Sequence, residues 1–181
     1  MLVKNIKTSA VVLLLFFLTG IYPNINAQSK KSQDMTGLNN NETVIRALED
    51  RFVAAFNAGD VDAIMKNYIA DQSFIIFDVV PRKQYRGADS YRQFWEEMFS
   101  HFKDTPKIAI ADLGITVDGN VGFGHSFQHV TGTDKLDNPI DRWVRVTNGY
   151  RKIEGRWLIA MEHISVPVNF ATGKLVPITG P

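Results

Sequence analysis

The chain has 181 residues, of which 20 are basic and 19 acidic, and it contains no cysteine. This length suits one domain with a substantial core. The lack of cysteine excludes disulfides, thiolate metal sites and a cysteine nucleophile. The balanced charge, without a concentrated basic face, argues against nucleic acid or an anionic membrane surface as a partner.

Residues 1–27 are predicted to be a secretory signal peptide. Lys4 and Lys7 precede an apolar run over 10–18, and a polar stretch then ends at the small residue Ala27. The apolar run is too short to span a bilayer comfortably. We therefore expect cleavage near Ala27, export to the periplasm or the extracellular space, and no stable membrane anchor.

Two helices are predicted next. Residues 28–41 are polar and are interpreted as a flexible leader before the domain proper. Asn41 is expected to cap a first helix, and a short second helix is expected to begin at Asp60 or Asp62 and to run through Tyr68. Helical spacing of apolar side chains supports the first helix at Val44, Ile45, Leu48, Phe52, Val53 and Phe56.

The rest of the chain is predicted to form five strands and one more helix. A strand over 73–80 precedes a helix over 89–102 with an aromatic stripe. Helices before strands indicate an α+β domain over 42–168, with helices on one face of a curved, mainly antiparallel sheet and a tail over 169–181. The later strands are expected near 107–117, 121–131, 141–153 and 156–166.

Three local signatures accompany this order of elements. They are Ala54-Ala55-Phe56-Asn57-Ala58-Gly59-Asp60, then Phe77-Asp78 followed by Tyr85-Arg86-Gly87-Ala88-Asp89, and lastly Gly155-x-Trp157 with His163-x-Ser165-x-Pro167. With them the chain resembles the nuclear transport factor 2-like superfamily, and within it the SnoaL-like, ketosteroid-isomerase-related group. The resemblance implies a cone-shaped, cystatin-like roll around three N-terminal helices, a deep conical pocket, and dimerisation through the outer sheet face.

The final predicted strand suggests which side chains face the pocket. Strict alternation would bring His163 and Ser165 into the inward face. Buried polar groups need hydrogen-bond partners or a cavity that holds water or ligand. The inward set is Trp157, Ile159, Met161, His163 and Ser165.

The opposite face of that strand is also largely apolar, at Leu158, Ala160, Ile164 and Val166. A sheet with solvent on one side should instead alternate cleanly between apolar and polar residues. A partner subunit in a homodimer would cover this face, and the alternative is a terminal segment folded over it.

Asp78 and His163 are the candidate catalytic residues. Asp78 ends an apolar run, and such surroundings raise a carboxyl pKa and create a useful base. Alternatively, it caps a turn near Pro81 or pairs with Arg82 or Arg86. His163 could move a proton while Arg145 on the neighbouring strand holds a substrate oxygen, or it could be a hydrogen-bonded structural histidine.

The candidate ligand-binding residues are Tyr68, Trp95, Phe99, His125, Trp143, Arg145 and Ser165. The aromatic ones could line a pocket for a flat apolar molecule or could simply form core. His125 shares the phase of Phe123 and Phe127 and is interpreted as inward, whereas His129 is expected to be exposed. His125, His129 and Asp78 match a metal triad in composition only, so no metal or cofactor is predicted.

Two functions remain open from the sequence. The first is an exported domain that binds a small hydrophobic molecule in a conical pocket, with isomerase-like or related proton transfer that needs no cofactor. The second is a non-catalytic, dimeric binding or scaffold module. The resemblance does not choose between them, because the superfamily includes isomerases, cyclases, dehydratases and hydrolases as well as domains that only bind or dimerise.

Overall fold

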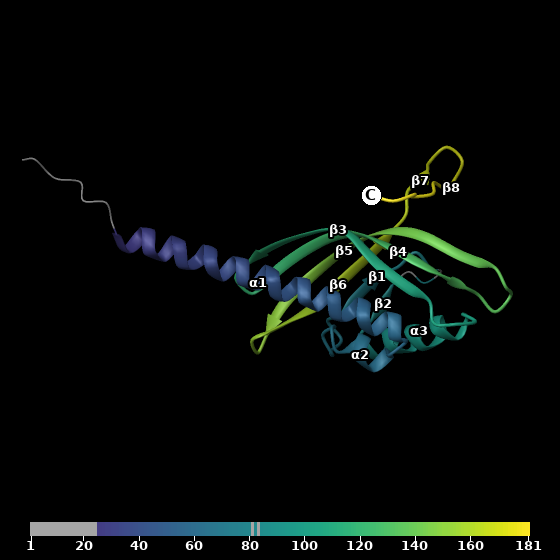
Figure 1. Ribbon diagram of the computed structural model, residues 1–181, viewed down its shortest axis with the longest axis horizontal. Coiled ribbons are helices and arrows are strands. Elements are labelled where there is room, and N and C mark those ends of the chain that lie inside the picture. The colour runs from purple at the N-terminus through teal and green to yellow at the C-terminus, as the bar shows by residue number, and fades with distance from the viewer. Residues whose placement is uncertain (1–24, 81, 83) are drawn as a thin grey trace, which may run out of the picture.

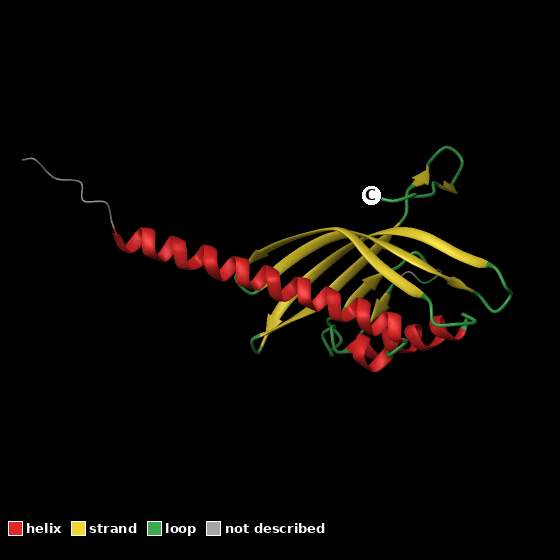
Figure 2. Ribbon diagram, in the orientation of Figure 1, coloured by secondary structure: helices red, strands yellow, loops and turns green. Residues whose placement is uncertain are grey.

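The computed structural model describes residues 25–80, 82 and 84–181. Most of the predicted signal peptide, residues 1–24, lies outside this part of the chain. The described residues form an α+β domain in which helices lie against a large curved sheet (Figures 1 and 2), as predicted. No helix within these residues combines the length and apolar character that crossing a membrane requires.

Helix α1 (Ile25–Ala58) is longer than predicted and extends well beyond the sheet (Figure 1). The expectation of a flexible leader over 28–41 is therefore wrong. The segment contains no proline and several good helix formers, so a helix held by its packed C-terminal part can continue through it. Asn41 does not cap the helix. Its Oδ1 accepts hydrogen bonds from Lys152 Nζ and Trp157 Nε1, both at 3.1 Å.

The signature after α1 fixes how the helices meet the sheet. Gly59 adopts φ +70°, which favours glycine, and its N–H donates to Phe56 O at 2.9 Å. Asn57 Oδ1 accepts the Ile108 N–H at 2.7 Å, which ties the end of α1 to the first long strand. Asp60 then caps α2 (Val61–Met65) by accepting the Ala63 N–H at 2.9 Å.

The main sheet has the strand order β2-β1-β6-β5-β4-β3. All neighbours are antiparallel except β1 and β6, which run parallel. The strand bounds are β1 Ile75–Phe77, β2 Tyr85–Arg86, β3 Lys107–Asp118, β4 Val121–Thr133, β5 Pro139–Ile153 and β6 Arg156–Ser165.

The remaining elements are α3 (Ala88–Ser100) and the short C-terminal strands β7 (Val168–Asn169) and β8 (Lys174–Leu175). The short strand β2 was not predicted. Strands β7 and β8 pair as a separate hairpin that projects away from the main sheet (Figure 1). The predicted tail over 169–181 therefore contains regular structure.

A β-bulge in β6 reverses the predicted alternation of side chains. Gly149 pairs with Met161, whereas Tyr150 pairs with Ile159, so Ala160 is an extra residue without an opposite partner. One added residue turns every later side chain to the other face. Glu162 is consequently only 3% exposed, whereas His163 is exposed on the outer face. The expectation that His163 faces inward is wrong.

In β4, too, the face that points toward the core is not the one that was predicted. Ser126 and Gln128 are buried, whereas Phe123 is 54% exposed and His125 is exposed. A Cβ on Gly124 would lie 2.8 Å from the hydroxyl of Tyr150, so glycine leaves room for that ring. Small and polar residues thus form the inner layer of β4, and its aromatic residues lie outside.

Candidate functional site: a buried carboxyl cluster

Glu162 is the centre of a polar cluster in the domain interior. The Tyr91 hydroxyl, from α3, donates to Glu162 Oε1 at 2.9 Å, and the Tyr68 hydroxyl contacts Oε2 at 3.4 Å. Burial raises the pKa of Glu162 to about 8, and the negative charges of Glu49 and Asp78 act in the same direction. At neutral pH this side chain is therefore mostly a neutral acid.

Glu49 supplies a second buried carboxyl from α1. Its Oε1 accepts hydrogen bonds from the Tyr150 hydroxyl at 2.6 Å and from Asn148 Nδ2 at 2.9 Å. Burial raises the pKa of Glu49 as well, although these two hydrogen bonds oppose the shift. Because Asn148 lies directly opposite Glu162 in the β5–β6 register, the two acids belong to one interior region.

Two polar atoms of this region have no hydrogen-bond partner within the described part of the chain. They are Trp95 Nε1 and Asn148 Oδ1, and both are buried. The Trp95 ring lies 5.1 Å from that of Tyr91, centroid to centroid, so the free indole N–H is close to the Glu162 cluster. An unpaired buried group costs about 1–3 kcal/mol, which a bound water or ligand would recover.

Asp78 lies immediately after β1 and is half-buried. Its Oδ1 accepts the Val79 N–H at 2.6 Å, so it caps the following turn, one of the alternatives inferred from the sequence. Burial raises the pKa of Asp78, as its apolar surroundings led us to expect. Its role as a catalytic base stays a prediction.

A cavity of about 370 Å³ lies between the loop that follows Asp78 and α3. Phe94, in its wall, stacks on Tyr91 with a centroid distance of 5.4 Å and an interplanar angle of 6°. One aromatic pair therefore connects this cavity to the acid that Tyr91 holds. The lining residues are Val80, Arg82, Tyr85, Phe94, Glu97, Met98 and His101.

The aromatic candidates divide between the interior and the outer face. Tyr68 and Trp95 are buried, and the half-buried Phe99 lies 5.3 Å from the Phe56 ring. Trp143 instead stacks on His129 on the outer face, at 4.3 Å and 3°. The assignment of Trp143 to the interior pocket is therefore wrong.

Histidine, arginine and hydroxyl side chains lie in one row on the outer face of β5 and β6. Thr147 lies opposite His163 and Arg145 opposite Ser165 in the β5–β6 register. Arg145 and His163 are exposed, and Ser165 is half-buried. Because the bulge at Ala160 turns His163 and Ser165 outward, onto the face of Arg145 and Thr147, these residues do not line the interior.

The histidines of β4 also lie on the outer face. His129 Nε2 contacts Asp141 Oδ1 at 2.6 Å, and His125 is exposed. His125 therefore does not line the interior pocket either. Within residues 25–80, 82 and 84–181, no group of three potential ligand side chains is arranged to hold a metal ion.

The sequence interpretation missed the acids and their partners, Glu162, Tyr91, Glu49 and Tyr150. The sequence does contain a pattern that indicates burial of each acid. Glu162 is the single acid on the largely apolar face of the last strand. Glu49 follows Ile45 by four residues and precedes Phe52 by three, which places it in the core stripe of α1. An acid at a core position was the overlooked pattern.

Comparisons with known proteins agree with this architecture. A family model described as a SnoaL-like domain matches residues 45–169. The chain has no significant match among curated proteins. An NTF2-like protein of unknown function from Pseudomonas putida is similar in structure, with a TM-score of 0.70 and 25% identity over 79% of this chain and 98% of that one.

Two further solved structures share the fold. An NTF2-like superfamily protein from Salmonella enterica gives a TM-score of 0.65 at 20% identity, covering 74% of this chain and 98% of that one. A ketosteroid isomerase-like protein from Erwinia carotovora gives 0.58 at 21%, covering 68% and 93%. At these identities the likeness extends to the fold alone.

Proposed function

Because the chain belongs to the SnoaL-like family of the NTF2-like superfamily, we propose that it binds a small, uncharged, largely apolar molecule beside Glu162. The observation that carries this proposal is the pair of unpaired buried atoms, Trp95 Nε1 and Asn148 Oδ1. A ligand with one acceptor and one donor, such as a hydroxylated ketone, would satisfy both. An anion would be disfavoured in this buried region, because burying an unpaired charge is costly.

We propose Glu162, rather than Asp78 or His163, as the acid–base group. A pKa of about 8 suits proton transfer near neutral pH, and the Tyr91 hydroxyl holds one of the two carboxyl oxygens. In its ionised form Glu162 would remove a proton from the carbon next to a ligand carbonyl. The resulting acid would return that proton to the same or a neighbouring carbon.

Ligand binding is tested by thermal-shift screening against uncharged ketones and phenols, with the hits titrated into two matched variants. Trp95→Phe keeps an aromatic ring but removes the buried N–H, so we expect about tenfold weaker binding. Trp143→Phe, the same change on the outer face, should bind as the wild type does. Equal affinity in all three proteins would contradict the proposed location.

Proton transfer is tested by NMR, through deuterium uptake from solvent at the carbon next to the carbonyl of a bound ketone. Exchange should be catalysed by the wild type and lost in Glu162→Gln. Binding without exchange in the wild type would instead favour the non-catalytic module.

The second candidate function, a dimeric scaffold, is supported by the outer sheet face. Phe123 is 54% exposed and Phe77 37% exposed there, beside the exposed His163 and Arg145. Exposed aromatic side chains on one sheet face are typical of a protein interface. We therefore propose a homodimer formed by this face, and export of the chain as the signal-peptide pattern predicts.

A further inference from the structure

The geometry points to a second binding site, on the outside of the domain, for a small organic anion with an apolar body. The site lies where α1, α2 and the start of β6 meet. It does not depend on the proposed interior site.

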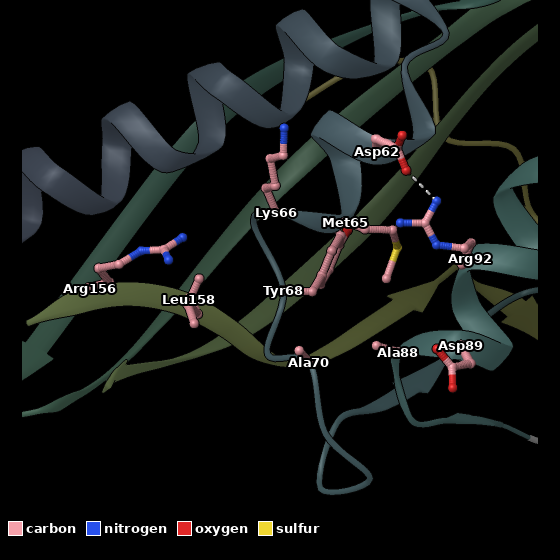
Figure 3. Close-up of a pocket in the computed structure, with 10 residues that line it drawn as sticks. All are labelled: Asp62, Met65, Lys66, Tyr68, Ala70, Ala88, Asp89, Arg92, Arg156 and Leu158. Carbon is pink, nitrogen blue, oxygen red and sulfur yellow. Dashed lines mark hydrogen bonds and ion pairs between the residues drawn. The ribbon is translucent and has the colours of Figure 1, made fainter. Parts of the chain in front are cut away.

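Two neighbouring cavities meet at this place. One of about 510 Å³ is drawn in Figure 3, and the other holds about 610 Å³. They share three lining residues, Lys66, Arg156 and Leu158. Both volumes are within the range of small-molecule sites.

Backbone hydrogen bonds fix the position of the shared residues. The Ile159 N–H donates to Asn67 O at 2.8 Å, and the Ile69 N–H donates to Ile159 O at 3.0 Å. Lys66 precedes Asn67 and Leu158 precedes Ile159, so this pairing holds Lys66 next to the start of β6. The backbone pairing therefore fixes where Lys66 and Leu158 lie relative to each other.

The larger cavity has an excess of positive charge. Arg51, Lys66 and Arg156 line it against one acid, Asp60, which already accepts the Ala63 N–H as the cap of α2. Within the described part of the chain, the side chains of Lys66 and Arg156 have no hydrogen-bond or ion-pair partner. An arginine with a free planar fork binds a carboxylate or sulfonate well.

The smaller cavity is closer to neutral. Its Asp62 and Arg92 form an ion pair with each other at 2.6 Å (Figure 3), and Asp89 offsets part of the charge of the shared cations. The excess of positive charge therefore lies toward the larger cavity.

The other walls of the larger cavity are mostly apolar. Alanines at helix positions leave a groove open that larger side chains would fill, and the indole of Trp157 and the side chain of Leu158 add apolar surface. An alkyl chain or an aromatic ring would lie along this wall while its acidic group contacts Lys66 and Arg156. The alanines are Ala54, Ala55, Ala58 and Ala63.

The experiment compares decanoate with decanol by calorimetric titration of the purified protein. The two probes share an alkyl chain and differ in charge, so the wild type should bind decanoate more tightly. Lys66→Met and Arg156→Met should each weaken decanoate binding about tenfold and leave decanol unchanged. Lys174→Met, an exposed lysine of the C-terminal hairpin, serves as the control and should match the wild type.

A filling variant, Ala54→Phe, tests the apolar wall. Ala54 is exposed, so the fold should tolerate the change, and binding of both probes should be lost. Trp95→Phe, which alters the interior region, should bind decanoate normally. Absence of decanoate binding, equal affinity for decanoate and decanol, or wild-type affinity in the Lys66, Arg156 and Ala54 variants would each overturn the proposal.

Discussion

Glu162 and Glu49 place two acids in the interior of a small domain. Each is held by a tyrosine hydroxyl, at 2.9 Å from Tyr91 and at 2.6 Å from Tyr150. The neutral form of a buried acid avoids the cost of desolvating a charge, so the fold favours protonation of both. The stability of the protein must then depend on pH in a defined direction.

The first prediction concerns this dependence. The pKa of Glu162 is about 8 in the folded chain, against its ordinary value of 4.5. Between these values the unfolded chain releases the proton while the folded chain retains it, so the free energy of unfolding falls as pH rises. The slope from one such group reaches about 1.4 kcal/mol per pH unit.

Urea unfolding from about pH 5 to about pH 8 measures this slope in the wild type and in Glu162→Gln. The variant should show a smaller slope, with the remainder carried by Glu49, whose pKa is raised in the same direction. Identical slopes in the two proteins would show that Glu162 does not titrate in this way.

The second prediction concerns Gly124. A methyl group there would lie 2.8 Å from the Tyr150 hydroxyl and 3.1 Å from Gly114 O, so Gly124→Ala should displace Tyr150 from Glu49. We expect a loss of about 1–3 kcal/mol in the free energy of unfolding. Gly149→Ala is the control, since its nearest contact would be an ordinary 3.5 Å from Met161 Cβ. Equal losses in both variants would argue against the displacement of Tyr150.

At the scale of elements, the bulge in β6 decides which residues form the interior site. Ala160 is unpaired between Ile159 and Met161, and this single residue exchanges the faces of Glu162 and His163. No glycine or proline stands next to Ala160 in β6, and the one sequence signal is Gly149 on β5, where the pairing register shifts. The last strand could be predicted from the sequence, whereas the face of its second half could not.

In the other elements, too, some features could be predicted from the sequence and others could not. Periodicity identified α3 and the long strands because an amphipathic pattern extends over many residues. The start of α1 was missed because the side chain of Asn41, a typical cap residue, contacts Trp157 instead, and only the folded β5–β6 hairpin makes that contact available. The inner face of β4 was missed because Gly124 and Ser126 look solvent-facing until Tyr150 covers them.

The third prediction is deletion of Ala160. Removing the extra residue would leave a regular strand in which Ile159 and Glu162 still face inward and His163 outward, so the free energy of unfolding should fall by only about 1–3 kcal/mol. Ala160→Ser retains the bulge and should cost far less. Chemical denaturation of both variants provides the measurement, and a loss of more than about 4 kcal/mol in the deletion variant would mean that the faces of Glu162 and His163 are exchanged.

At the scale of the whole molecule, the sheet separates two chemical environments. The inner face holds buried acids, tyrosines and unpaired polar atoms, and the outer face presents aromatic, histidine and arginine side chains. The first environment supports a small-molecule site and the second supports association between copies of the chain.

The fourth prediction tests that association. Phe123→Glu places a charge on the outer face and should convert the proposed dimer to a monomer without unfolding it, as measured by light scattering. Leu136→Glu, at a residue 82% exposed in the β4–β5 connection, should remain dimeric. A wild-type protein that is monomeric at high concentration would contradict the proposed interface.

The most direct test of the interior site is infrared difference spectroscopy of the wild type against Glu162→Gln, recorded across a pH titration. We predict a protonated carboxyl band that is present at neutral pH, disappears with a midpoint of about 8, and is missing from the variant. A Glu162 that is already fully ionised at neutral pH would contradict a buried acid at the centre of this domain.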